Sequence, residues 1–115
     1  EMLELQDLVR ADFGAQVRTF VQRSPRYLGT MCEVIDREAG KWSAVVHVAE
    51  QWGVAPEEIC AVGDDVNDAT MIEGAGLGAA MGHAPAEVRA LADLILPDHE
   101  NDGVSALVDH LLAAR

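Results

Sequence analysis

Positive charge is scarce in this sequence. Lys and Arg together contribute 8 residues against 20 Asp and Glu, and the formal net charge is −12. A chain this acidic repels both the nucleic-acid backbone and anionic membrane surfaces, so we expect neither nucleic acid nor membrane as a partner. Lysine is almost missing, because Lys41 is the only one and every other basic residue is arginine. That single lysine therefore needs an explanation.

Cysteine and long apolar runs are also scarce. Cys32 and Cys60 are the only cysteines, are far apart and form no C-x-x-C pair, which favours free thiols and a reducing cytoplasmic setting. No apolar run approaches the length of a membrane span, and the first residues show no signal-peptide pattern. Half of the 115 residues are hydrophobic, which is enough for a folded domain with a core.

The first part of the chain combines helical spacing with two β-rich stretches. The pattern predicts a helix and two antiparallel strands, over residues 2–12, 16–22 and 30–36. The segment between the two strands contains Pro25 and Gly29 and is typical of a loop. Gly40 then breaks the chain, and we expect it to separate this α-β-β segment from the remaining residues, 41–115.

The second part alternates short apolar stretches with helical ones. Strands are predicted over residues 59–63, 77–82 and 93–97. Helices are predicted over residues 41–52, 68–75, 85–92 and 103–114. Continuously apolar strands that alternate with helices indicate an α/β fold, in which helices cover both faces of a parallel sheet.

The stretch GDDVND, residues 63–68, follows the first of these strands and precedes a helix. Ligands of open α/β sheets bind at the carboxyl ends of the strands. Mg²⁺ needs only one or two protein carboxylates, and Asp64, which leaves the strand first, is best placed to supply one. The alternative is a solvated loop whose Asp and Asn side chains cap the next helix.

Four segments together resemble a known family. Lys41 opens a helix, GDDVNDATM follows a strand, and GLGAAMGHAPAEVRALAD and NDGV come later. This series resembles the C-terminal half of a haloacid-dehalogenase-superfamily phosphatase, and within that superfamily the Cof-type branch with a large α/β cap. The resemblance covers roughly residues 30–115. It implies a Rossmann-like three-layer core with parallel strands over residues 40–115, preceded over residues 1–39 by the tail of an α+β cap domain.

The resemblance also implies a role for each matched side chain, with Mg²⁺ as cofactor. Asp64 is similar to the family's metal ligand, and Asn67 to its contact with the substrate phosphate. Asp68 is similar to the acid that orients the lysine or a metal-bound water, so we count it both as catalytic and as a metal ligand. Lys41 is similar to the catalytic cation that also contacts the phosphate. Asp65 occupies a variable position and has no assigned role.

One part of the family pattern is missing. The chemistry needs an Asp-x-Asp pair that supplies a nucleophile and a general acid, and no Asp-x-Asp occurs in this sequence. The Ser or Thr of the family's second motif has no candidate either. We therefore expect the chain to be a C-terminal fragment of a longer protein, or a truncated product. The parent would hydrolyse a small phosphorylated metabolite through an aspartyl-phosphate, and the chain alone would be inactive.

Two alternatives remain from other classes of protein. The chain could be a non-catalytic module that keeps only a metal or anion site, or that serves oligomerisation. A phosphoacceptor receiver domain is disfavoured, because receivers place their acidic pair early and their lysine late. The resemblance places the strand over residues 59–63 beside the absent nucleophile-bearing strand, so this strand would have an open edge. We therefore expect self-association, or pairing with the missing N-terminal half.

Overall fold

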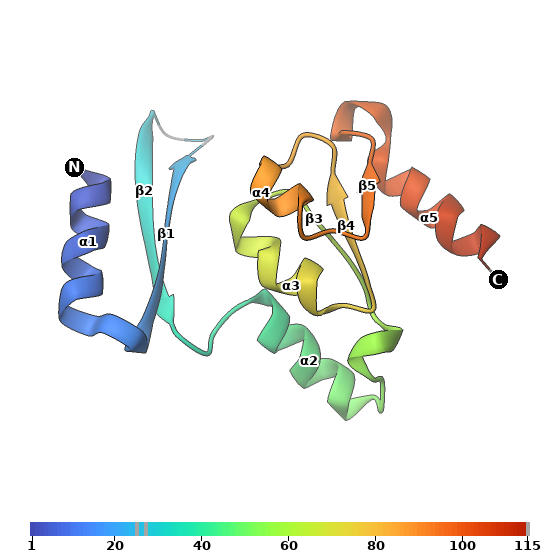
Figure 1. Cartoon of the computed structure of the whole chain (residues 1–115), viewed down its shortest axis with the longest axis horizontal. Coiled ribbons are helices and arrows are strands. Elements are labelled where there is room, and N and C mark those ends of the chain that lie inside the picture. The colour runs from blue at the N-terminus through green and yellow to red at the C-terminus, as the bar shows by residue number, and fades with distance from the viewer. Residues whose placement is uncertain (25, 27, 115) are drawn as a thin grey trace. The chain divides into compact units, whose positions relative to one another are not determined.

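The structure is a computed structural model that describes residues 1–24, 26 and 28–114. Pro25, which contributed to the loop prediction, lies outside the described residues. The chain divides into two compact units, Glu1–Gly40 and Lys41–Arg115, and their elements are labelled in Figure 1. The assignment of these units to a cap and a core domain stays a prediction.

The first unit contains the predicted helix and antiparallel strands: α1 (Met2–Phe13), β1 (Val17–Ser24) and β2 (Gly29–Asp36). A two-stranded hairpin is marginally stable alone, and α1 packs on it. Gln6 Nε2 donates to the carbonyl oxygen of Thr19 at 3.2 Å, and Arg10 Nε donates to Thr19 Oγ1 at 2.8 Å. Polar side chains of the helix are thereby fixed to the middle of β1.

The second unit has the predicted parallel sheet, in the order β3 (Cys60–Gly63), β4 (Leu77–Met81) and β5 (Leu94–Leu96). Its helices are α2 (Lys41–Gln51), α3 (Ala69–Gly74), α4 (Ala86–Arg89) and α5 (Gly103–Ala113). The predicted α/β class is therefore confirmed. None of the helices in the described residues combines the length and the apolar character needed to cross a membrane.

The helix predicted over residues 85–92 is shorter than expected. It ends at Arg89, because the chain turns back so that Asp93 can pair with the start of β4. The backbone N–H of Asp93 donates to the carbonyl of Gly78 at 2.8 Å, and the Asp93 carboxylate accepts from the Gly78 N–H at 2.8 Å. These two bonds join the residue just before β5 to β4. Local helical propensity could not predict this contact between segments that are distant in the sequence.

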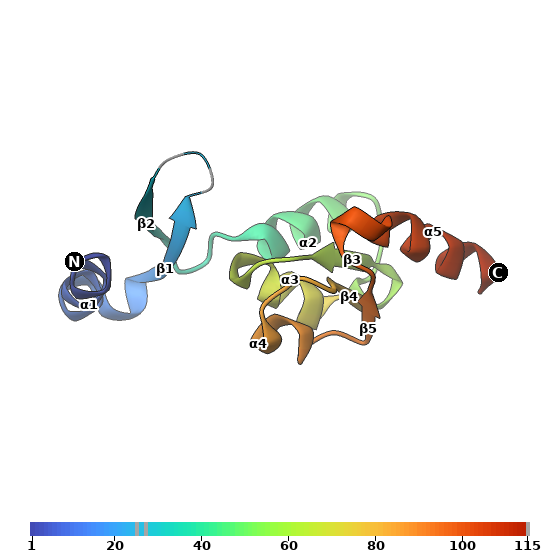
Figure 2. The same cartoon turned by 90° about the horizontal axis from the view of Figure 1, so that it is seen from above.

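Both faces of the sheet are covered, as the sequence predicted. On one face a buried cluster joins α3 and α4 to β4, through Ile72, Ala80, Ala84 and Val88. On the other face a second cluster joins α5 to β4 and β5, through Ala79, Met81, Leu96 and Leu107. Figure 2 shows α4 and α5 on opposite sides of the strands. Consecutive alanines of β4 thus point to opposite faces, and their small size lets helices approach from both.

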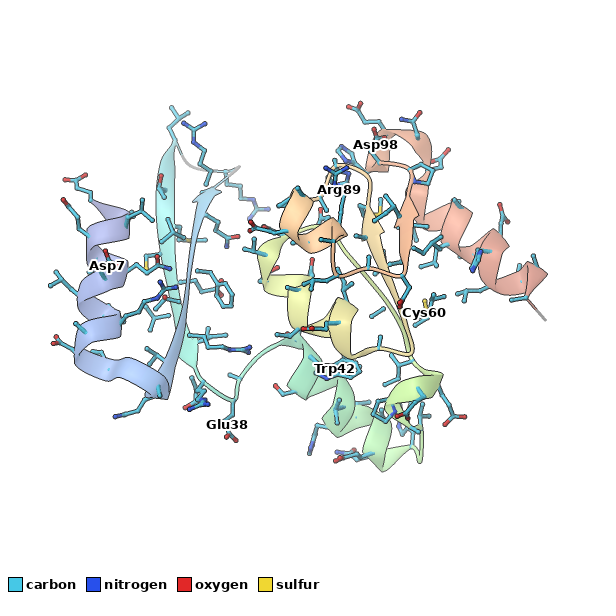
Figure 3. The ribbon with its side chains drawn as sticks, viewed as in Figure 1. Asp7, Glu38, Trp42, Cys60, Arg89 and Asp98 are labelled. Carbon is cyan, nitrogen blue, oxygen red and sulfur yellow. The ribbon has the colours of Figure 1, made fainter. Side chains whose placement is uncertain are left out.

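Helix α2 packs beside α3. Figure 3 shows Trp42 reaching from α2 towards α3, and a Cβ added to Gly74 would lie 2.3 Å from the Trp42 ring. Only a glycine therefore fits at this contact. The close approach fixes the first turn of α2, which carries Lys41, relative to the elements that come after β3.

The rest of α2 has an open apolar stripe. Val45, Val48, Ala49 and Trp52 follow helical spacing along this segment, but only Ala49 is buried, and Trp52, which directly follows α2, is 78% exposed. These side chains line an open groove of about 420 Å³.

In the part of the chain that the structure describes, no strand pairs with the outer edge of β3. The sheet therefore ends at β3.

Candidate active site

The acidic loop lies at the carboxyl end of β3, where the sequence placed it. Asp65 begins a 3₁₀ turn over Val66–Asp68, and its Oδ1 accepts the backbone N–H of Val66 at 2.7 Å. This capping bond matches the structural role that the alternative interpretation gives to an acid in this loop. The turn leads directly into α3.

Asp68 is the buried centre of the loop, and its side chain is only 5% exposed. Its Oδ1 accepts a hydrogen bond from Lys41 Nζ, in an ion pair that joins α2 to the loop. Its Oδ2 accepts the backbone N–H groups of Asp64 at 2.9 Å and of Asp65 at 3.1 Å. Both carboxylate oxygens are therefore engaged, and they hold the backbone of the loop as well as the lysine.

The surroundings of Asp68 favour its ionised form. Burial by itself would raise the pKa of Asp68, but the hydrogen bonds from Lys41 and from the backbone of Asp64 and Asp65 outweigh burial, so its pKa lies below the ordinary value. Hydrogen bonds to a charged carboxylate stabilise that charge. The Asp68 carboxylate is thus a permanent anion at neutral pH.

Lys41 begins α2, where the helix macrodipole disfavours a cation. The Asp68 carboxylate compensates for this position. Lys41 Nζ also donates to Asn67 Oδ1 at 3.3 Å, and its side chain is 51% exposed. The structure therefore brings Lys41, which is far away in the sequence, together with Asn67 and Asp68. Their catalytic and phosphate-binding roles stay predictions.

The side chain of Asp64 is 58% exposed and has a different neighbour. Its Oδ2 lies 3.2 Å from Nε2 of His83, in the turn after β4. His83 Nδ1 in turn lies 3.3 Å from Nδ1 of His99, in the turn after β5. Sequence reasoning gave neither histidine a role. Their positions just after consecutive parallel strands were the available signal, since such turns meet at one edge of a sheet.

The loop can offer a metal ion one carboxylate that carries no backbone hydrogen bond. Asp65 is used as a cap and both oxygens of Asp68 are engaged, which leaves Asp64. Within the described residues, no three His, Cys, Asp or Glu side chains form a group that could hold a metal. One exposed carboxylate fits Mg²⁺, which keeps water or phosphate oxygens in its other positions. The second predicted ligand, Asp68, stays a prediction.

Comparison with known proteins assigns the chain to a family. It matches the haloacid dehalogenase-like hydrolase family over residues 2–108 and belongs to it, as the resemblance predicted. Among curated proteins, the phosphatase YwpJ of Bacillus subtilis (strain 168) is 39% identical over 80 residues. That match covers 70% of this chain and 28% of YwpJ.

Solved structures agree with this assignment. A haloacid dehalogenase-like hydrolase from B. subtilis superposes with a TM-score of 0.78 at 30% identity, covering 95% of this chain and 37% of that one. The subclass IIB sugar phosphatase BT4131 also superposes with a TM-score of 0.78, at 26% identity, covering 95% of this chain and 40% of its own. The chain therefore spans less than half the length of each of these proteins.

Proposed function

We propose that this chain supplies part of the active site of a Mg²⁺-dependent phosphatase. The whole protein would hydrolyse the phosphate monoester of a small metabolite through an aspartyl-phosphate, with the nucleophilic carboxylate supplied from outside these 115 residues. The observation that carries the proposal is the cluster of Lys41, Asn67 and Asp68 at the carboxyl end of β3, in a chain of this hydrolase family.

Phosphoryl transfer depends mainly on positioning and on neutralising charge, and the cluster is suited to both. The ammonium group of Lys41 stabilises the nucleophile's carboxylate and the charge on the transferring phosphoryl group. Asp68 holds that ammonium group in place. Asn67 accepts from Lys41 through Oδ1, which directs its Nδ2 amide to donate to a phosphate oxygen.

The proposed active site also includes a Mg²⁺ ion. When bound, Mg²⁺ neutralises phosphate charge and orients the oxygens around phosphorus. Asp64 contributes its exposed carboxylate, and Asp68 contributes as the second acid by fixing the backbone of Asp64 and orienting Lys41.

The free thiols of Cys32 and Cys60 support a reducing cytoplasmic location.

The 115-residue chain alone is expected to be inactive, because it contains no Asp-x-Asp. The same absence favours one alternative, a non-catalytic module that keeps a metal or anion site. The genomic reading frame upstream of Glu1 separates the two: an Asp-x-Asp there supports the phosphatase.

The experiment compares the longer frame with the present chain. Both are assayed for hydrolysis of an aryl phosphate, with Mg²⁺ and with EDTA, and the longer frame is also tested as Lys41→Ala and Asp64→Ala. We expect activity only in the longer protein with Mg²⁺, and a loss of at least about 100-fold in each variant, as for removal of one charge-stabilising group. Asp64-dependent turnover by the short chain would contradict its proposed inactivity. An inactive longer frame would favour the non-catalytic module.

A further inference from the structure

His83 and His99 form a pair at the carboxyl edge of the sheet. The arrows of β4 and β5 point to the same end in Figure 1, and the two histidines lie in the turns that follow these strands. Their Nδ1 atoms are 3.3 Å apart. The ring centroids are 4.5 Å apart and the rings are nearly perpendicular, at 85°. Sixteen positions separate the two residues in the chain, so their proximity is a product of the tertiary fold.

The tautomer of His83 follows from its second contact. Its Nε2 lies 3.2 Å from Oδ2 of Asp64, and a carboxylate only accepts hydrogen bonds. In the neutral ring Nε2 therefore carries the proton and donates it, which leaves a lone pair on Nδ1, the atom that faces His99. That lone pair accepts the backbone N–H of His99 at 3.4 Å, a long and weak hydrogen bond that a metal ion would replace. Metal-binding histidines have this arrangement, in which one ring nitrogen binds the ion and the other donates to a carboxylate.

The separation of the two Nδ1 atoms suits a tetrahedral ion. Two nitrogens that each lie about 2.0–2.1 Å from a tetrahedral Zn²⁺ are separated by roughly 3.3–3.4 Å. At similar bond lengths, a right angle at the ion would require about 2.8–3.0 Å. The observed 3.3 Å is also the length of a direct His83–His99 hydrogen bond, and it lets both nitrogens reach one tetrahedral ion without a large movement of either ring. Imidazole nitrogens also select zinc and its neighbours over Mg²⁺, which prefers oxygen ligands.

We propose that His83 and His99 bind a tetrahedral transition-metal ion, Zn²⁺, through their Nδ1 atoms, with the Asp64 carboxylate as the hydrogen-bond partner of His83. Binding requires His99 to carry its ring proton on Nε2. In the described part of the chain no third His, Cys, Asp or Glu completes a metal group, so water occupies the two remaining positions. The affinity is therefore lower than that of a closed four-ligand zinc site.

This site does not depend on the proposed phosphatase function. Neither histidine is a ligand or a catalytic group in that proposal. The two sites share Asp64, which would bind Mg²⁺ there and accepts a hydrogen bond from His83 here. The net charge of −12 assists by raising the local concentration of cations. The two proposals can consequently fail separately.

Zinc titration of the 115-residue chain by calorimetry tests the site, with ZnCl₂ as the probe. We expect one equivalent to bind, and the affinity to fall at least tenfold in His83→Gln and in His99→Gln. His47→Gln and His110→Gln are matched controls on α2 and α5 and should bind as the original chain does. Both histidines of the pair are exposed residues, and a circular dichroism spectrum verifies that each variant is folded.

Nitrogen-15 spectra of the imidazole rings provide the second readout. On adding Zn²⁺, the Nδ1 resonances of His83 and His99 should both move to the chemical shift of a metal-bound nitrogen. Their Nε2 resonances should have the chemical shift of a protonated nitrogen. The proposal is overturned if no stoichiometric binding occurs, if either His→Gln variant of the pair binds as tightly as the original chain, or if Cys thiols or Nε2 atoms prove to be the ligands.

Discussion

The side chain of Asp68 lies directly against the α-carbon of Gly63. A Cβ built on Gly63 would lie 2.3 Å from Cβ and 2.6 Å from Cγ of Asp68, well inside the distance at which carbon atoms can approach. The last residue of β3 must therefore be glycine for Asp68 to reach Lys41 and the loop backbone at the same time. Gly63 positions the acid although it has no side chain.

Gly63→Ala should displace Asp68 and destabilise the second unit. Forcing extra volume into a well-packed position typically costs about 1–3 kcal/mol, and we expect a loss in that range in the free energy of unfolding by urea. Gly29→Ala is the control, because a Cβ there meets nothing within 4 Å and should change the free energy by less than about 0.5 kcal/mol. Equal effects of the two substitutions would contradict the close contact.

Lys41→Met should raise the pKa of Asp68, because the substitution removes both a hydrogen bond and a positive charge from the carboxylate. Carbon-13 titration of the side-chain carboxyl groups measures this directly. Asp98 is an internal control: its pKa is lowered chiefly by the hydrogen bond from the Asn101 side chain, and Lys41 is not among its contacts. A Lys41→Met protein with an unchanged titration of Asp68 would show that the ion pair is absent in solution.

The contribution of Asp68 to stability should depend on pH in a definite direction. Its pKa in the folded chain lies below the ordinary value of 3.8, so the ionised carboxylate stabilises the fold above that value, and the contribution disappears as pH falls through the folded pKa. Asp68→Asn should therefore lower the free energy of unfolding by about 1.5–3 kcal/mol at pH 7 and by progressively less in acid.

Urea unfolding between pH 2.5 and 7 measures this difference. Asp109→Asn, on an exposed residue of α5, controls for the loss of one negative charge. A difference between Asp68→Asn and the original chain that stayed constant over the whole pH range would contradict the depressed pKa.

Mg²⁺ binding by the 115-residue chain should be weak. The loop offers the exposed carboxylate of Asp64, while Asp65 and Asp68 accept backbone hydrogen bonds, and one or two carboxylates make a tight site only together with other ligands. Calorimetric titration with MgCl₂ should give a dissociation constant in the millimolar range or above. Asp64→Ala should remove the binding, while Asp109→Ala, on an exposed residue of α5, should leave it. A micromolar constant would reveal another set of ligands.

The chain should also self-associate, unless another segment covers β3. In the described residues, the outer edge of this strand has no partner, and an unpaired inner strand is a template for another chain. Each buried backbone group left unpaired costs about 1–3 kcal/mol, a large share of the roughly 5–15 kcal/mol that stabilises a domain. Sedimentation velocity between 1 and 100 µM, at high salt to screen the negative charge, should show dimers or larger species. A well-folded monomer with β3 as a bare edge would contradict this prediction.

The order of helices and strands could be predicted from the sequence because each depends on a local pattern. Alternating apolar strands and helices predicted the parallel sheet, and the five strands and five α-helices of the described residues were predicted to within a few residues. The largest error was the length of α4. This helix ends early because the residues after it turn back so that Asp93 can bond to Gly78, and helical propensity carries no information about that distant contact.

The sequence by itself determined the family and the identity of the candidate residues, since GDDVND and the single Lys41 are visible in one dimension. Only the tertiary structure decided which side chains meet. Lys41 and Asp68 are 27 positions apart and His83 and His99 are 16 apart, and their contacts depend on how α2 packs and on the order of strands in the sheet. The same packing decided that Asp68 is buried and fully engaged while Asp64, four residues earlier, keeps an exposed carboxylate. Burial and hydrogen bonding are properties of the fold, so neighbouring acids of one loop acquire different chemistry.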